Sequence, residues 1–381
     1  MDWVSMLVGA GVGAVVSLIV DKFVWVGAQA KWQAARQKRR HERINALHLQ
    51  FQDLHPALHL VQSGWDQDGC FPESSVVIRR AGDFEPGSVG NELRAAHQRA
   101  WNSAGLVDGQ QYGIKSFQIR RVSDDAHAEL TGTAHVMEIE SHSYLYFDFQ
   151  STHVLRLFGT DDERTRLDAV AVGHSSDQPV KAFPTPLSVG LSLVCEGGET
   201  LVLTRRSTAA GGAGYWAAGK RFNAVGENAA ERDFTSLSGP VGLTTPHQVA
   251  RRGLFEEMGF SDSDLAATSV RLHTFAWASD LLDYKFFGYA ASSLSFTDVE
   301  RRWQQAPDRH ETSGTVLGRL PFGSREDCMR ILADIRSSGG DWAAEATFCT
   351  IYTMVAMGRI RVDDVLSFLM RPLPAAPGGR G

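Results

Sequence analysis

The chain contains 381 residues, of which 43% are hydrophobic and 22% are charged. Both fractions are ordinary for globular proteins, so a largely disordered chain is excluded, and the length indicates two or three domains. The formal net charge of −6 excludes an overall basic bias, so we expect no DNA or RNA duplex among the partners.

The N-terminal segment is apolar. No charged residue occurs between Trp3 and Val20, and apolar character resumes after Asp21 and Lys22. This length approaches what a helix needs to cross about 30 Å of hydrocarbon. A cleaved signal peptide is the alternative, but it would carry its positive charge before the apolar run rather than after it. We therefore expect a retained transmembrane anchor over residues 1–27.

Residues 28–62 follow the anchor and are predicted to form one stalk helix, basic at first and amphipathic later. The basic residues after the span place the N-terminus outside and the body of the chain in the cytoplasm, at the inner membrane. They also predict attraction to anionic lipid of the bilayer, unless they form only a solvated helix face. The basic residues are Lys31, Arg36, Lys38, Arg39, Arg40 and Arg43.

Small residues recur every four positions in the predicted anchor, at Ser5, Gly9, Gly13 and Ser17. Such a stripe lets two membrane helices approach closely, so it predicts self-association through the anchor. The alternative is chance, because glycine and serine are common in membrane helices.

The body of the chain is predicted to contain two domains. Residues 63–184 form a β-rich α+β domain, with strands predicted at 76–79, 112–122, 127–139, 143–149 and 154–158, and a helix at 91–104. Residues 185–370 form a second domain, with strands predicted at 188–195, 200–204, 271–277 and 285–291, and helices at 324–337 and 342–358. Residues 371–381 are predicted to form a flexible tail.

One helix of the second domain has clear start and stop signals. Thr245 and Gln248 have the spacing of a capping box, and Pro246 suits the first helical position. Gly259 is a natural stop. The last turns of this helix carry Arg252, Glu256 and Glu257, where the arginine can pair with Glu256 four residues on.

Adjacent carboxylates that converge with loop groups can hold Mg²⁺, which prefers oxygen ligands. The alternative is an ordinary solvated helix face. The run Arg252-Gly-Leu-Phe-Glu-Glu-Met-Gly-Phe260, however, resembles the second half of the Nudix box, Arg-Glu-aliphatic-x-Glu-Glu-x-Gly-aliphatic. The resemblance implies a Nudix-like α/β/α sandwich with a mixed sheet over residues 185–370. It also implies Mg²⁺ as cofactor and a nucleoside diphosphate-linked ligand, with Glu256, Glu257 and Arg252 as catalytic residues.

The sequence departs from the family pattern at three positions. Gly253 stands where the family has a glutamate after the arginine, Thr244 stands at the upstream glutamate, and Ser238 stands at the leading glycine. Glu311 or Glu227 can replace one missing carboxylate, and either is otherwise an ordinary surface residue. The predicted metal ligands are Glu256, Glu257 and Glu311.

The predicted nucleotide-binding loop lies upstream of the capped helix. Its candidate binding residues are Trp216, Gly219, Lys220 and Phe222, where either aromatic ring can stack a base or pack in the core. The whole layout looks like the membrane-anchored Nudix proteins associated with bacterial cyclic-oligonucleotide synthetases in antiviral defence. We therefore expect a nucleotide-binding protein with weak or no hydrolysis. An active Mg²⁺-dependent pyrophosphohydrolase and a purely structural scaffold are the alternatives.

Overall fold

The structure is a computed structural model of the chain, in which two compact units, residues 1–46 and 47–381, are described separately. In the first unit, residues 42–46 are helical. The described residues are 35, 38–39, 42–51, 55–66, 68–85, 110–121, 135–145, 160–162, 165, 184–206, 219–235, 242–278, 283–310, 315–338 and 341–370. No helix among them is long and apolar enough to cross a bilayer, and the predicted anchor, residues 1–27, lies outside them.

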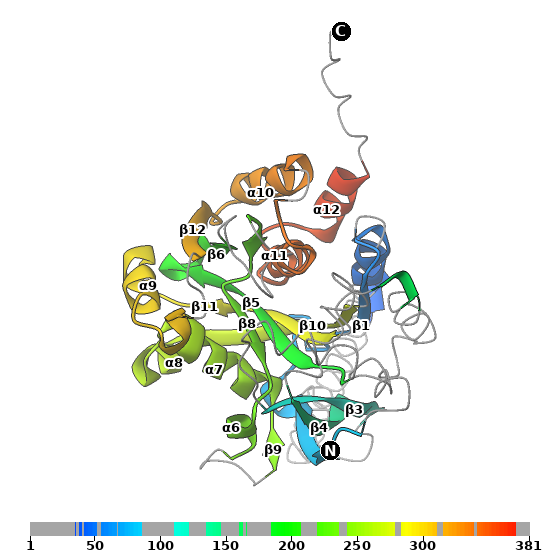
Figure 1. Cartoon of the computed structure of the whole chain (residues 1–381). Coiled ribbons are helices and arrows are strands. Elements are labelled where there is room, and N and C mark those ends of the chain that lie inside the picture. The colour runs from blue at the N-terminus through cyan, green and yellow to red at the C-terminus, as the bar shows by residue number, and fades with distance from the viewer. Residues whose placement is uncertain are drawn as a thin grey trace, which may run out of the picture. The chain divides into compact units, whose positions relative to one another are not determined.

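The second unit is built on a large mixed sheet (Figure 1). Within the described residues this sheet has eight strands, in the order β1–β10–β11–β5–β6–β12, with β8 paired to β5 and β7 to β6. Strand β5 runs parallel to β11 and antiparallel to β6. The strands are β1 (Leu58–Ser63), β5 (Leu187–Cys195), β6 (Thr200–Arg206), β7 (Arg221–Phe222), β8 (Val225–Asn228), β10 (Ser269–Ala278), β11 (Asp283–Ala291) and β12 (Thr315–Pro321).

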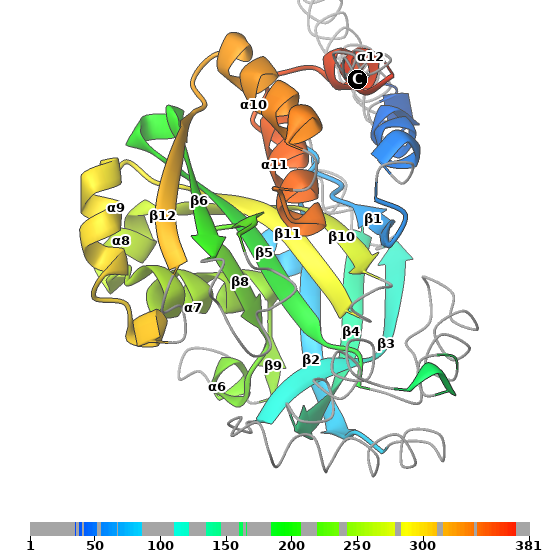
Figure 2. The ribbon, with the colours of Figure 1, turned by 45° about the horizontal axis from the view of Figure 1, so that its top comes forward.

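Strand β5 is buried along its whole length because helices cover both of its faces. Its alternate residues from Leu187 to Cys195 join a hydrophobic core that includes Leu254 of α7 (Pro246–Met258). On the other face, Ser192 donates a hydrogen bond to Cys349 of α11 (Ala344–Ala356). Successive strand residues point to opposite faces, so α7 and α11 lie on opposite sides of the sheet (Figure 2). The expected mixed α/β fold is confirmed.

A second, smaller sheet includes the strand that directly precedes α7. Within the described residues its order is β3–β4–β2–β9, formed by β2 (Val76–Asp83), β3 (Gln110–Arg121), β4 (His135–Leu145) and β9 (Leu243–Thr244). Strand β9 pairs with β2 and ends one residue before the N-cap of α7. Segments on both sides of the predicted domain boundary at residue 184 therefore share this sheet.

The structure describes further helices outside the sheet-covering pair α7 and α11. They are α6 (Glu231–Phe234), α8 (Asp262–Ala267), α9 (Phe296–Trp303), α10 (Arg325–Ser337) and α12 (Val362–Leu369), with short 3₁₀ helices η1 (Glu73–Ser75), η2 (Glu196–Gly198) and η4 (Pro307–His310). The predicted helices at 324–337 and 342–358 correspond to α10 and α11. The predicted helix at 91–104 and strand at 154–158 lie outside the described residues.

The stalk-helix prediction is wrong at its C-terminal end. Residues 47–51 are helical, but residues Leu58–Ser63 form strand β1, which pairs antiparallel with β10. Pro56 explains the change, because proline has no backbone N–H and disfavours helical geometry in the residue before it. The exposed edge of β10 then provides hydrogen-bond partners that the isolated segment lacks.

Candidate functional site

The helix that carries the predicted carboxylates begins and ends where the sequence predicts. The Thr245 hydroxyl accepts a hydrogen bond from the Gln248 backbone N–H at 3.2 Å. The Gln248 side-chain oxygen accepts one from the Thr245 N–H at 3.0 Å, which completes the capping box. Gly259 ends the helix at a φ of 69°, a left-handed conformation that glycine adopts without strain.

Arg252 of α7 lies at the centre of an ion-pair network. Its Nε donates to Oδ1 of Asp233 at 2.8 Å, and its Nη1 donates to Oε2 of Glu256 at 2.6 Å. The same Nη1 lies 3.0 Å from Oε1 of Glu227, and Nη2 donates to the backbone carbonyl of Asn228. The side chain is only 10% exposed. Arg252 therefore holds carboxylates from α6, α7 and β8 in place.

Three carboxylates beside this arginine form a group that can hold a metal ion. One oxygen from each of Glu227, Glu256 and Asp308 lies within 4.8 Å of the other two. Glu256 is 3% exposed, whereas Glu227 and Asp308 are half-buried. Asp308 comes from η4, which packs against α7. Carboxylate oxygens are the ligands that Mg²⁺ prefers, so the chemistry of this group fits that ion.

Burial and repulsion between carboxylates shift the pKa values of Glu227 and Glu256. Burial raises the pKa of Glu227 to about 7; Arg252 opposes the shift, and the negative charge of Glu256 adds to it. Burial also raises the pKa of Glu256, against the opposing effect of Arg252. Burial alone would lower the pKa of Arg252, but its hydrogen bonds to Asp233 and the neighbouring carboxylates raise it overall. A bound cation would relieve the repulsion among these carboxylates.

Both oxygens of Glu256 are engaged by arginines. Oε1 forms an ion pair with Arg232 and Oε2 with Arg252. The two arginines differ in exposure, because the side chain of Arg232 is 61% exposed and that of Arg252 is 10% exposed. Arg232 can move into solvent more easily than Arg252, and such a movement would free Oε1 of Glu256.

Gly253 lets α7 pack closely on β8. A Cβ atom at this position would lie 2.6 Å from Cγ1 of Val225 and 2.9 Å from Cβ of Glu227. The space that a family glutamate needs here is taken by Glu227, which brings its own carboxylate to the group. A longer side chain at position 253 would therefore meet Val225 and Glu227 in this packing.

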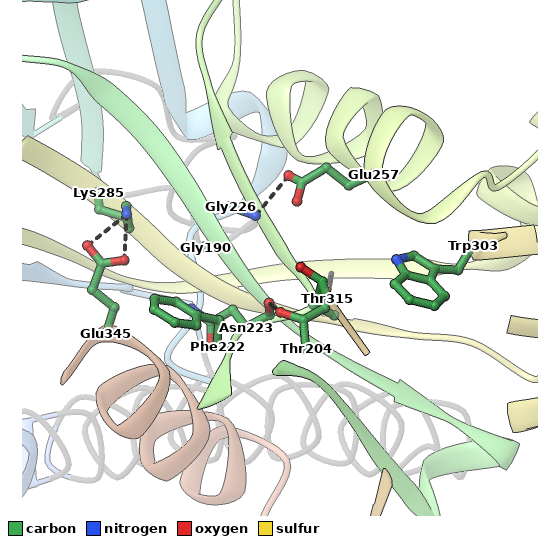
Figure 3. A pocket seen from close by; sticks show the side chains of 11 residues that line it. Gly190, Thr204, Phe222, Asn223, Gly226, Glu257, Lys285, Trp303, Thr315 and Glu345 are labelled. Atoms are coloured by element: carbon green, nitrogen blue, oxygen red, sulfur yellow. Dashed lines mark hydrogen bonds and ion pairs between the residues drawn. The ribbon is translucent and has the colours of Figure 1, made fainter. Parts of the chain in front are cut away.

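Glu257 lies apart from the three-carboxylate group. Its carboxylate accepts a hydrogen bond from the backbone N–H of Gly226 at 2.9 Å. This contact forms part of the wall of an open pocket between β5, β6, β11 and the ends of α7 and α11 (Figure 3). The pocket is lined by Gly190, Thr204, Phe222, Asn223, Ala224, Gly226, Glu257, Lys285, Trp303, Thr315 and Glu345.

The predicted binding residues are distributed unevenly around this pocket. Phe222 lines the pocket, and its binding role stays a prediction. Gly219 and Lys220 lie in the turn before β7, where the Gly219 carbonyl accepts a hydrogen bond from Nε of Arg205 at 3.0 Å. Trp216 and Glu311 lie outside the described residues.

Sequence reasoning missed Asp308 and Asp233. Asp308 is 52 residues beyond Glu256 in a short polar segment, and no spacing rule connects the two. Asp233 lies in α6, a four-residue helix that carries no strong sequence signal. A weak signal did exist for Glu227, which follows a glycine after the predicted binding loop.

Comparison with family models and with curated proteins finds no match for this chain. The functional argument therefore rests on the site itself.

Proposed function

We propose that this protein binds a Mg²⁺-complexed nucleotide through a Nudix-like site on α7 and hydrolyses it weakly or not at all. One observation carries the proposal: residues adjacent in the chain belong to the pocket and to the three-carboxylate group. Gly226 and Glu257 line the pocket, and their chain neighbours Glu227 and Glu256 belong to the group. A ligand with a base or sugar in the pocket can therefore reach a metal with its phosphates.

Glu227, Glu256 and Asp308 would hold the metal, which supplies charge neutralisation of a diphosphate and activation of water. Arg252 acts as a positioning residue, because its donors already bind Asp233, Glu227 and Glu256. The mixed sheet with α7 and α11 on opposite faces supports the Nudix-like α/β/α sandwich that the box implies.

Two features support binding without rapid turnover. The family box has glutamates at the positions that Gly253 and Thr244 occupy in this chain. The chain therefore has no carboxylate at either of these positions. Glu256 also has both oxygens paired to arginines, so a metal must displace Arg232 before it can use this ligand. Loss of a ligand or a base costs orders of magnitude in rate when the metal and its water do the chemistry.

The alternative, an active pyrophosphohydrolase, also has a specific observation in its favour. Glu227 supplies a carboxylate that the linear box lacks, and burial raises the pKa of this group to about 7. A carboxylate that titrates near neutral pH is suited to take up a proton from attacking water.

The N-terminal anchor belongs to the same proposal. A single span with a basic flank would tether the site to the cytoplasmic face of the inner membrane, and the small-residue stripe would bring copies together. In that setting a slowly hydrolysed nucleotide serves as a signal, as the resemblance to defence-associated Nudix proteins implies.

The deciding experiment is thermal unfolding of the full chain with Mg²⁺ and a panel of nucleoside diphosphates and triphosphates, with product release measured in parallel. A ligand at about 100 times its Kd adds roughly 2.7 kcal/mol to the folded state. We expect Glu256→Gln to remove the Mg²⁺-dependent part of this stabilisation. The matched control is Glu326→Gln, an exposed glutamate of α10 that does not line the pocket. Identical shifts in wild type and Glu256→Gln would refute the site.

A further inference from the structure

The pocket lies where two strands separate along one edge of β5. Strand β11 pairs with the first edge of β5 along almost its whole length, so β8 and β6 share the second edge. Strand β8 pairs with residues 188–191 of that edge, and β6 pairs with residues 193–195. The pocket is lined by Gly190 of β5, Gly226 of β8 and Thr204 of β6, so it occupies the point at which β8 and β6 diverge (Figure 3).

Two glycines lie opposite each other at this point. Gly190 pairs with Gly226, and both line the pocket. The neighbours of Gly226 in β8, Val225 and Glu227, are the residues that a Cβ atom on Gly253 of α7 would meet, so they face α7. Side chains alternate between the two faces of a strand, so a side chain at position 226 would point away from α7. The glycine pair therefore leaves this part of the sheet bare of side chains.

Packing explains the first glycine but not the second. A Cβ atom on Gly190 would lie 3.0 Å from Nδ2 of Asn223 and 3.1 Å from Cδ1 of Phe287, so side chains already fill that space. A Cβ atom on Gly226 would meet no heavy atom within 4 Å beyond its chain neighbours, and the φ of Gly226 lies outside the left-handed region. Glycine inside a strand weakens it, because the unfolded chain has more freedom to lose. Neither packing nor backbone conformation therefore requires a glycine at position 226.

The backbone at this position is nevertheless fixed. Strand β8 is held by its pairing with β5, and the N–H of Gly226 donates to the Glu257 carboxylate at 2.9 Å. A fixed backbone without side chains presents peptide planes that a flat group can cover at van der Waals distance. Close approach of a ligand is one of the reasons for a glycine inside a strand.

The lining residues come from both sides of the sheet. Glu257 belongs to α7 and Glu345 belongs to α11, the helices on opposite faces. At the α11 end, Nζ of Lys285 donates to both carboxylate oxygens of Glu345, at 2.8 and 2.7 Å, so its charge is already neutralised. Glu227 and its carboxylate group lie on the α7 side of β8. The phosphates of a nucleotide are therefore expected on the α7 side, and its ring between the strands beside Gly226.

We infer that Gly226 is a specificity-determining residue, whose missing side chain gives the nucleobase a place against the backbone of β8 and β5. The inference rests on the proposed nucleotide-binding function and adds the residue that admits the ring. A side chain at position 226 would occupy the place of the ring, whereas the carboxylate of Glu227 points to the other face of the strand.

The test adds side chains at this position. Gly226→Ala and Gly226→Val should keep or raise the urea midpoint of the ligand-free protein, because the space is open and valine suits a strand. Binding of ATP, GTP, CTP and UTP to the full chain with Mg²⁺ is measured by calorimetry. We expect the affinity for the tightest of the four to fall at least threefold in Gly226→Ala and at least tenfold in Gly226→Val.

Two controls separate the ring contact from other effects. Gly318→Val adds the same side chain to β12, where a Cβ atom would meet only the Leu203 carbonyl oxygen at 3.8 Å and where the glycine does not line the pocket. This variant should bind all four nucleotides as wild type does. Mn²⁺ alone should bind Gly226→Val as it binds wild type, because the added side chain faces away from Glu227.

The outcomes separate the inference from the proposed function. Wild-type nucleotide affinity in Gly226→Val would overturn the inference and leave the proposed function standing. A loss of stability in both variants at position 226 would also overturn it, because the space would not be open. Equal losses of Mn²⁺ and nucleotide affinity in Gly226→Val would assign its effect to the metal group and overturn the ring contact. Absence of binding of all four nucleotides to wild type would overturn both proposals.

Discussion

A Cβ atom placed on Gly253 would lie 2.9 Å from Cβ of Glu227, although the two residues come from a helix and a strand. The glycine and the glutamate are therefore complementary, since the first leaves room for the second. This relationship explains how α7 lacks one box carboxylate while the site still gathers three. It also determines what substitution at either position will do.

Gly253→Ala should destabilise the protein by about 1–3 kcal/mol, because overpacking a close helix–strand contact forces side chains or backbone to move. Helix propensity alone would make the alanine variant more stable by about 1 kcal/mol. A loss of stability would therefore come from the close contact between α7 and β8. Gly253→Glu should destabilise the protein further and should not raise turnover. Gly318→Ala is the control, since its added Cβ meets only an atom 3.8 Å away. Urea denaturation measures all three. Stabilisation by Gly253→Ala would contradict the packing.

Replacing Arg252 should destabilise the folded protein far more than replacing Arg251. Arg252→Met leaves the buried carboxylates of Asp233 and Glu256 without their cation, so we expect a loss of about 3–5 kcal/mol at pH 7. The control is Arg251→Met, whose half-exposed ion pair with Glu73 should contribute less than about 1 kcal/mol. Chemical denaturation measures both losses. Equal effects of the two substitutions would show that the network does not stabilise the fold.

The titration of Glu227 should appear in the pH dependence of stability. Its pKa in the folded protein, about 7, lies above its ordinary value of 4.5. The folded state therefore binds more protons between these two values, so stability from this group is greatest below pH 4.5 and falls as the pH rises through 7. Wild type should lose about 1–3 kcal/mol over this window relative to Glu227→Gln. Parallel pH profiles of the two proteins would show that the pKa is not raised.

Asp308 should contribute to metal binding although it is distant from the box in sequence. Asp308→Asn removes one of three clustered carboxylates, and we expect at least a tenfold loss of affinity for Mn²⁺ or Mg²⁺ alone. Titration calorimetry of the ligand-free chain measures it. Asp262→Asn, at an exposed position on α8, is the control and should bind as wild type does. Wild-type affinity in Asp308→Asn would exclude Asp308 as a ligand.

The orientation of the predicted anchor can be tested separately from the site. A reporter fused after Gly381 should be active only in the cytoplasm, because the basic residues follow the apolar segment rather than precede it. The control reverses this asymmetry by moving four basic residues to the N-terminus. A body that resists protease in inverted vesicles would contradict the orientation.

The sequence alone determined the features that depend on near neighbours. The capping box, the proline and the terminal glycine of α7 act within one helix, so their spacing predicts its start and its end. The strands predicted at 188–195 and 200–204 likewise correspond to β5 and β6, which pair antiparallel with each other. The pairing of Arg252 with Glu256 also follows from helical spacing.

Only the tertiary structure decided which distant residues complete the site. Glu227, Asp233 and Asp308 meet Arg252 and Glu256 because β8, α6 and η4 pack around α7, and no local period encodes those contacts. The same holds for β1, where the unpaired edge of β10 outweighs an amphipathic pattern that favours a helix. Local spacing thus determines where a side chain lies on its own element, whereas packing between elements determines which charges it meets.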